Sequence, residues 1–256
     1  MPGTRDCGCI VAWIVAWSPW EDILYTAASG EPAGQRLEGS QRLPKAVLWD
    51  MDGTLVDTEP YWIETEFELA ATYGGTWSQE HALALVGNDL LTSGRYIREH
   101  MGIDLEPERI VELLLDGVVA RVEQHVPWCP GARELLLDLH AAGIPCGLVT
   151  MSYERFVAPI LLELPPRTFS VVVTGDQVDN GKPHPEPYLT AAAALGVAPR
   201  DCIAIEDSDT GTRSAEAAGC QVVVVPNHVP VAPGVCRHVR PDLTAVTIAD
   251  LAGLVS

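Results

Sequence analysis

Apolar runs of strand length alternate with amphipathic helical patterns through the second half of the chain. The pattern predicts helices over residues 130–142, 153–162, 186–195 and 209–218, and strands over residues 146–149, 170–173, 202–205 and 221–225. These strands are short, rich in β-branched residues and apolar on both faces, as in parallel sheets that helices cover on both sides. An earlier apolar run, Ala46–Trp49, predicts one more strand. We therefore expect an α/β fold with a doubly wound, Rossmann-like parallel sheet.

Four helical patterns in succession separate the first predicted strand from the alternating units. They cover residues 59–73, 78–85, 89–100 and 106–126. In the first of them the apolar residues lie at helical spacing and the glutamates fall between them, which predicts an amphipathic helix with exposed glutamates. The apolar positions are Ile63, Phe67 and Ala70, and the glutamates are Glu64, Glu66 and Glu68. On spacing alone, this block is a helical subdomain inserted into the α/β chain.

The first 44 residues show neither pattern. Their apolar run, Cys9–Trp17, is shorter than the ~20 residues that a membrane-spanning helix needs, so we expect no such helix there. The flank before it has only Arg5 against Asp6, which argues against a secretory signal peptide. A glycine-containing stretch without periodicity follows. Residues 1–44 are therefore expected to be a loosely ordered extension, or an upstream addition from a wrongly assigned start codon.

The composition is that of a globular, enzyme-sized protein. A chain of 256 residues with 47% hydrophobic content can bury a core. The formal charge of −19 argues against a nucleic-acid or anionic-membrane surface, because both need clustered Lys and Arg. The seven cysteines are scattered without a Cys-x-x-Cys pair, which favours reduced thiols in a cytoplasmic protein over zinc or disulfides. In so acidic a chain, any phosphate site must reverse the local field with a metal and a nearby cation.

Two aspartates follow the first predicted strand directly. Residues i and i+2 of a strand share a face, so Asp50 and Asp52 are expected to point toward one small volume. Two such close carboxylates are stable only with a cation between them, with a shared proton, or in environments that separate their pKa values. Each arrangement is useful in catalysis. The alternative is a solvated turn, because Asp-x-Asp arises by chance in a chain with 35 acidic residues.

Three further polar segments follow predicted strands or approach predicted helices, where parallel sheets bind ligands. Thr150 could hold a phosphate oxygen or act as an ordinary helix N-cap. Lys182 stands among prolines that keep its segment extended, and a fixed cation suits a developing phosphoryl charge; a solvated surface lysine is the alternative. Glu206 and Asp207 end a strand with a cluster of carboxylates, and such oxygen ligands suit Mg²⁺.

Taken in order, these segments resemble the four signatures of the haloacid dehalogenase-like superfamily of phosphotransferases. The matching strings are Asp-x-Asp-Gly-Thr, the strand-end Thr, Gly-Lys-Pro and Glu-Asp-Ser-x-x-Gly, and the resemblance covers roughly residues 45–256. It implies that Asp50 is a nucleophile that forms an aspartyl-phosphate and that Asp52 is the general acid and base. It also implies that Thr150 and Lys182 hold the phosphoryl oxygens.

The resemblance further implies a metal site and a division into domains. Mg²⁺ would be held by Asp50, the backbone carbonyl of Asp52, and Asp207, with Glu206 adjacent or acting through water. The α/β catalytic core would comprise residues 45–58 and 128–256, and residues 59–127 would form a mobile helical cap. The resemblance places the two hinge strands at residues 58–60 and 126–130. Specificity in this family depends largely on the cap, here near Gly87, Asn88 and Asp89.

The function implied is that of a cytoplasmic, Mg²⁺-dependent phosphatase for a small phosphorylated metabolite such as a sugar phosphate or phosphoglycolate. The second aspartate, Asp52, counts against carbon–halogen cleavage. A hexose-phosphate mutase of the β-phosphoglucomutase type is the main alternative. Those enzymes carry a histidine where this chain has Trp62, and an arginine in the cap loop that corresponds to residues 87–90. Water is therefore the favoured acceptor, and a catalytically silent binding or regulatory protein stays open as a second alternative.

Overall fold

The computed structural model describes residues 43–255, and the expectations for residues 1–42 lie outside the described residues. Within them, one sheet contains six strands in the order β3-β2-β1-β4-β5-β6, and every neighbouring pair is parallel. The strands are β1 (Ala46–Trp49), β2 (Cys146–Val149), β3 (Val171–Val173), β4 (Cys202–Glu206), β5 (Gln221–Val224) and β6 (Arg237–Val239). The chain extends the sheet first to one side of β1 and then to the other. The switch point therefore lies between β1 and β4, and the predicted α/β fold is confirmed.

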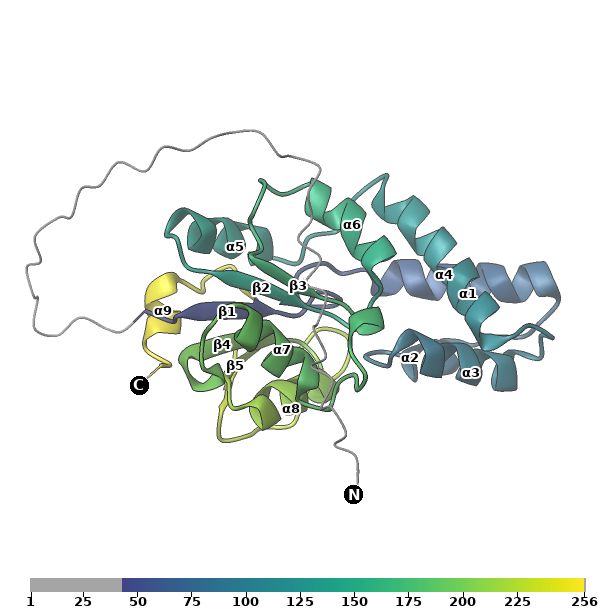
Figure 1. Cartoon of the computed structure of the whole chain (residues 1–256). Helices are drawn as coiled ribbons and strands as arrows, with labels where there is room; N and C mark the ends of the chain where they lie inside the picture. Colours follow the sequence, from purple (N-terminus) through teal and green to yellow (C-terminus); the bar gives the residue numbers. More distant parts are fainter. Residues whose placement is uncertain (1–42, 256) are drawn as a thin grey trace, which may run out of the picture. The chain divides into compact units, whose positions relative to one another are not determined.

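Helices cover both faces of this sheet (Figure 1). On one face lie α5 (Ala132–Ala141), α6 (Glu154–Leu162) and α9 (Ile248–Ala252), and their apolar residues share a cluster with Val47 and Trp49. On the other face lie α7 (Glu186–Ala194) and α8 (Asp209–Ala218), which pack against Ala46 and Leu48. Successive residues of β1 thus enter different apolar layers, as the two-residue period of a strand requires. All four residues are fully buried, so β1 is the centre of the core.

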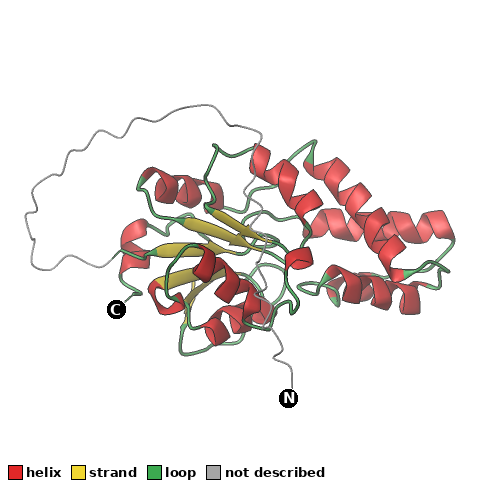
Figure 2. Cartoon of the chain, viewed as in Figure 1, coloured by secondary structure: helices red, strands yellow, loops and turns green. Residues whose placement is uncertain are grey.

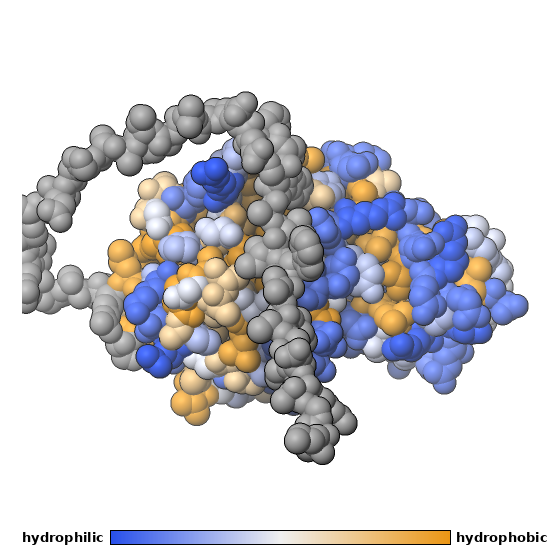
Figure 3. Space-filling view, viewed as in Figure 1, coloured by the Kyte–Doolittle hydropathy of each residue, from blue (hydrophilic) through white to orange (hydrophobic). Residues whose placement is uncertain are grey.

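Four helices stand between β1 and β2 in the chain: α1 (Glu59–Tyr73), α2 (Gln79–Leu83), α3 (Leu90–Met101) and α4 (Pro107–Val122). Figure 2 shows that this part of the molecule contains no strand, and hydrophilic residues dominate its visible surface in Figure 3. The two connections to the sheet pair with each other, because Val56 forms an antiparallel bridge with Trp128. The first hinge strand was expected at residues 58–60. That expectation is wrong, since Glu59 and Pro60 already belong to α1.

The buried face of α1 differs from the predicted one. Phe67 is 39% exposed, whereas Glu66, expected in solvent, is only 4% exposed. Trp62, Glu66 and Leu69 lie at i, i+4 and i+7 and form the true inner stripe. A carboxyl group is tolerated there because the indole Nε1 of Trp77 donates a hydrogen bond of 2.8 Å to Glu66 Oε2. The sequence pattern identified the helix, the buried Ala70 and the exposed Glu64 and Glu68, but it assigned Glu66 and Phe67 to the wrong faces.

The remaining differences lie at the C-terminal end. Neither β6 nor α9 was predicted, because β6 is a short edge strand containing Arg237 and His238, and α9 has only five residues. The described cysteines, residues 129, 146, 202, 220 and 236, carry free thiols. Among residues 43–255, no helix combines the length and the apolar character that crossing a bilayer requires.

Candidate active site

The predicted site residues gather at the carboxyl ends of β1, β2 and β4, next to the switch point of the sheet. Asp50 follows β1, Thr150 follows β2, and Asp207 follows β4. These three side chains line one cavity together with Asp52 and Lys182. The carboxyl ends of adjacent parallel strands meet at one edge, so groups more than 150 residues apart in sequence become neighbours. The structure thus brings together the side chains of the four separate sequence segments.

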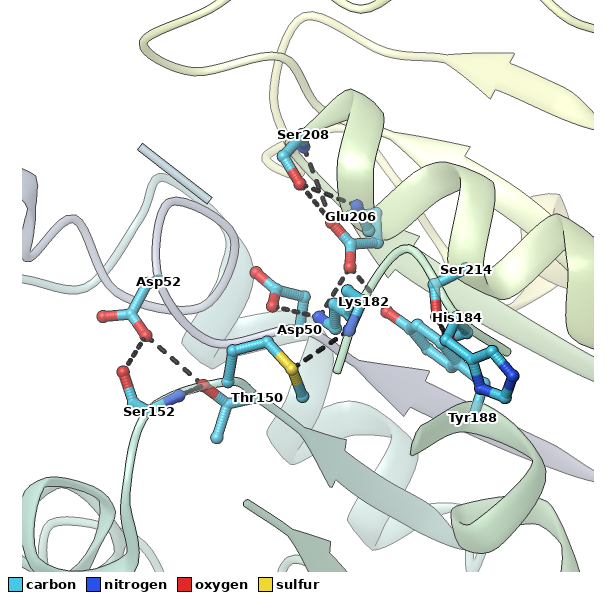
Figure 4. A network of polar contacts seen from close by, with 12 residues as sticks. Asp50, Asp52, Thr150, Ser152, Lys182, His184, Tyr188, Glu206, Ser208 and Ser214 are labelled. Atoms are coloured by element: carbon cyan, nitrogen blue, oxygen red, sulfur yellow. Dashed lines mark hydrogen bonds and ion pairs between the residues drawn. The ribbon is translucent and has the colours of Figure 1, made fainter. Parts of the chain in front are cut away.

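Lys182 links two of the acidic segments. Its Nζ donates hydrogen bonds to Asp50 Oδ1 at 2.6 Å and to Glu206 Oε1 at 2.7 Å (Figure 4). The lysine side chain is only 4% exposed. Burial alone would lower the pKa of Lys182, but the charges of Asp50 and Glu206 outweigh burial and hold that pKa above its ordinary value. The site therefore contains a fixed, desolvated cation beside the Asp50 carboxylate.

Glu206 anchors this lysine and is itself held on all sides. Its Oε1 also accepts a 2.7 Å hydrogen bond from the Tyr188 hydroxyl, and its Oε2 accepts one of 3.2 Å from Ser208 Oγ. The close fit depends on Gly211 at the start of α8, because a Cβ there would lie 1.8 Å from Glu206 Oε1. With both oxygens engaged, Glu206 is committed to positioning Lys182. Tyr188 was not predicted as a site residue, although it follows Lys182 by only six residues.

Three carboxyl groups form a compact acidic cluster. Oxygen atoms of Asp50, Glu206 and Asp207 all lie within 4.8 Å of one another. Burial and the charge of Glu206 raise the pKa of Asp50 to about 7, and burial with the charge of Asp50 raises the pKa of Asp207 well above its ordinary range. Close approach is possible because residue 53 is a glycine at φ +85°, where a Cβ would lie 2.1 Å from Asp207 Oδ2.

This cluster fits a hard divalent cation. Its donors are carboxylate oxygens, the ligand type that Mg²⁺ and Ca²⁺ prefer. Asp50 Oδ2 is buried and has no hydrogen-bond partner among the described residues, although an oxygen without a partner is costly in such a position. A cation among these groups would satisfy that oxygen and reduce the repulsion that raises the pKa values of Asp50 and Asp207.

Asp52 lies among hydroxyl groups. Its Oδ1 accepts a 2.5 Å hydrogen bond from Thr58 Oγ1. Its Oδ2 accepts bonds from Ser152 Oγ at 2.8 Å and Thr150 Oγ1 at 3.3 Å (Figure 4). Burial raises the pKa of Asp52, although these hydrogen bonds oppose the rise. Thr58 and Ser152 were not predicted as site residues. Their positions directly beside the first and second motifs were the available signal.

The helical segment contributes the opposite wall of the cavity. Of the three residues expected to set specificity, Gly87 and Asn88 line the cavity. Asp89 does not; it is the exposed N-cap of α3, where its Oδ1 accepts a 2.9 Å hydrogen bond from Thr92 N. Two carboxyl groups that the sequence did not single out also line this wall, Glu59 and Glu66. The spacing of residues could not identify Glu59 and Glu66, because both lie among other acidic residues on a helix whose glutamates were predicted to be exposed.

Comparison with known proteins yields one family and several close relatives. Residues 47–225 match the family model described as haloacid dehalogenase-like hydrolase. Hexitol phosphatase B of Escherichia coli (strain K12) is 32% identical, over 81% of this chain and 96% of that protein. Phosphoglycolate phosphatase of Salmonella paratyphi A is 35% identical, over 70% of this chain and 80% of that protein.

A solved structure shows the same fold over nearly its whole length. A variant of CbbY from Rhodobacter sphaeroides, in complex with xylulose-(1,5)bisphosphate, superposes with a TM-score of 0.73 at 26% sequence identity. The alignment covers 82% of this chain and 99% of the CbbY chain. The similarity therefore includes both the sheet and the inserted helices.

Proposed function

The chain belongs to the haloacid dehalogenase-like hydrolases, and we propose that it is a Mg²⁺-dependent phosphatase acting on a small phosphorylated metabolite in the cytoplasm. The resemblance expected from the four motifs is confirmed, as is the predicted enzyme class of a phosphatase of this family. One observation carries the proposal. Lys182 bridges Asp50 and Glu206 inside a buried cluster that also contains Asp207, so an anion-binding cation and cation-binding carboxylates adjoin one nucleophile.

We assign the metal ligands from this geometry and the family motif. Asp50 and Asp207 would hold the ion together with the backbone carbonyl of Asp52, while Glu206 keeps Lys182 in place. A bound Mg²⁺ supplies positive charge that offsets the clustered carboxylates and the charge of the phosphoryl oxygens. The partnerless Asp50 Oδ2 supports this assignment.

In the proposed reaction, a carboxylate oxygen of Asp50 attacks phosphorus, and the bond from phosphorus to the ester oxygen breaks. Lys182 favours the ionised form of Asp50 and neutralises charge on the phosphoryl oxygens. The hydroxyl of Thr150 donates a hydrogen bond to a phosphoryl oxygen. Asp52, protonated at this stage, gives its proton to the leaving alkoxide. As a carboxylate it then takes a proton from the water that attacks the aspartyl-phosphate, which releases phosphate and restores Asp50. The raised pKa of Asp52 supports its first role.

Two features favour transfer of the phosphoryl group to water over transfer to a second sugar. The position that carries a histidine in the mutases is Trp62, whose buried ring packs edge-on against Phe156 with centroids 5.3 Å apart. The segment from Gly87 to Leu90 contains no arginine to hold a second phosphate. We also propose that residues 59–127 act as a cap that closes over residues 45–58 and 128–256, with the paired segments around Val56 and Trp128 as the hinge.

Hydrolysis of p-nitrophenyl phosphate tests the proposal. Activity should require Mg²⁺ and should fall by at least ~10³-fold in Asp50→Asn, which removes the nucleophile. Asp104→Asn, the same change at an exposed position, is the matched control. Intact-protein mass spectrometry of rapidly quenched wild-type enzyme should detect one added phosphoryl group that is absent from Asp50→Asn. Metal-independent hydrolysis, or an Asp50→Asn variant as active as the control, would rule the proposed function out.

A further inference from the structure

Glu66 is a buried carboxyl group without a part in the proposed reaction. It is 4% exposed and lines the same cavity as Asp50 and Lys182. Trp77 Nε1 holds its Oε2 at 2.8 Å, and among the described residues its Oε1 has no hydrogen-bond partner. The Trp77 ring is itself fixed, because it stacks on the His81 ring with centroids 5.0 Å apart. One oxygen of a rigidly held carboxyl group is thus available to a ligand in the cavity.

Glu59 lies on the same wall of the cavity, about two helical turns before Glu66 in α1. It also lines the cavity, and among the described residues it has neither a hydrogen bond nor an ion pair. Burial raises the pKa of Glu59 to about 8, with contributions from the charges of Glu66 and Asp52, and burial raises the pKa of Glu66 to about 7. Neither residue belongs to the acidic cluster that fits a cation. Metal binding therefore does not account for the presence of Glu59 and Glu66 in the cavity.

The remaining wall contains no free cation for an anionic substituent. Among the described residues that line the cavity, the basic side chains are Lys182 and His228. Lys182 is bound to Asp50 and Glu206, and His228 Nε2 lies 2.6 Å from Asp57 Oδ1. The other lining groups on the helical side are apolar or uncharged: Trp62, Leu85, Val86, Asn88, Leu90, Ser93 and Leu114.

These features define the chemistry of the leaving group. A buried carboxyl group forms hydrogen bonds with hydroxyl groups in either protonation state, because the neutral form both donates and accepts and the ionised form accepts. Above pH ~8 both groups are ionised, since their pKa values are about 7 and 8, and bonds to a charged acceptor are the stronger kind. In that form they also repel a second phosphate or a carboxylate, and repulsion between like charges is strong in a site shielded from water. We infer that Glu66 and Glu59 bind hydroxyl groups of the leaving group, so that the enzyme selects sugar or polyol monophosphates over esters with a second anionic group. This inference rests on the proposed function.

Three substrates separate the possibilities: sorbitol 6-phosphate, phosphoglycolate, and p-nitrophenyl phosphate, whose leaving group carries no alkyl hydroxyl. We expect wild-type kcat/KM for sorbitol 6-phosphate to exceed that for phosphoglycolate at least ~10-fold. Glu66→Leu should lower the ratio of kcat/KM for sorbitol 6-phosphate over p-nitrophenyl phosphate by roughly 10- to 100-fold, the loss of one charged hydrogen bond. Glu66→Gln keeps the hydrogen bond from Trp77 but removes the negative charge. It should lower the ratio of kcat/KM for sorbitol 6-phosphate over phosphoglycolate about 10-fold. Glu64→Gln, the same change at an exposed position of α1, should alter neither ratio.

Several results would overturn the inference. One is a wild-type kcat/KM for phosphoglycolate that exceeds the value for sorbitol 6-phosphate. Another is a Glu66→Gln variant whose kcat/KM falls equally on all three esters, which would make Glu66 a purely structural residue. Failure of the wild-type enzyme to hydrolyse any of them, p-nitrophenyl phosphate included, would instead refute the proposed function on which the inference depends. Glu66→Gln preserves side-chain size, so it keeps the test open if Glu66→Leu does not fold.

Discussion

The buried carboxyl group of Glu66 makes the stability of the fold depend on pH in a predictable direction. Burial raises its pKa from 4.5 to about 7, so the folded protein keeps a proton that the unfolded chain releases. Its contribution to stability is therefore fully present below pH 4.5 and declines as the pH rises toward 7. The shift corresponds to about 3 kcal/mol once the carboxyl group is ionised in both states, at about 1.4 kcal/mol per pKa unit.

Replacing Glu66 with glutamine should remove this dependence. The amide oxygen can still accept the hydrogen bond from Trp77, and the side chain no longer ionises. We expect Glu66→Gln to exceed the wild type in stability by under about 1 kcal/mol at pH ~5 and by about 3 kcal/mol at pH ~8. Loss of the Glu66 charge also lowers the pKa of nearby Glu59, which acts in the same direction.

Urea unfolding monitored by tryptophan fluorescence measures these differences, with a chelator present so that metal binding does not contribute. Glu64→Gln, a change of an exposed side chain on the same helix, is the control and should shift stability by less than about 0.5 kcal/mol at either pH. A difference between Glu66→Gln and wild type that stays constant from pH ~5 to ~8 would refute the reasoning, because Glu66 would then ionise as freely in the folded protein as in the unfolded chain.

Three further predictions concern the centre of the site. Tyr188→Phe removes one of the hydrogen bonds that hold Glu206 and should lower kcat/KM about 10-fold, the effect of roughly 1.4 kcal/mol; unchanged kinetics would show that Lys182 is positioned without it. Gly211→Ala places a Cβ 1.8 Å from Glu206 Oε1 and should destabilise the fold by at least ~1–3 kcal/mol; a variant with wild-type thermal stability would contradict this close contact. Mg²⁺ at about 100 times its Kd should stabilise the protein by about 2.7 kcal/mol in thermal unfolding, and Asp207→Asn should lose most of that gain; an equal gain in both proteins would exclude Asp207 as a ligand.

Much of the site could be predicted from the sequence because its residues occupy the ends of strands. A two-sided apolar strand identifies itself within a few residues, and the carboxyl ends of parallel strands meet at one edge of the sheet. The strand ends that carry Asp50, Thr150 and Asp207 therefore followed from local pattern, and the resemblance to the family motifs selected these residues over the alternatives of a solvated turn and an ordinary helix cap. Lys182 followed from its motif, although the pattern did not reveal that Glu206 rather than solvent surrounds it.

The faces of α1 and the surroundings of Asp52 were decided by tertiary structure. Helical periodicity predicts a helix, but several stripes of α1 contain both apolar and acidic residues, and only packing determines which one is buried. Glu66 is inside because Trp77 supplies a hydrogen bond from another segment, and Asp52 is held by Thr58 and Ser152 for the same kind of reason. Local sequence thus determined five of the six described strands and the edge of the sheet where the polar residues gather. Tertiary packing decides which carboxyl groups are buried and how far their pKa values shift, because both depend on partners that are distant in sequence.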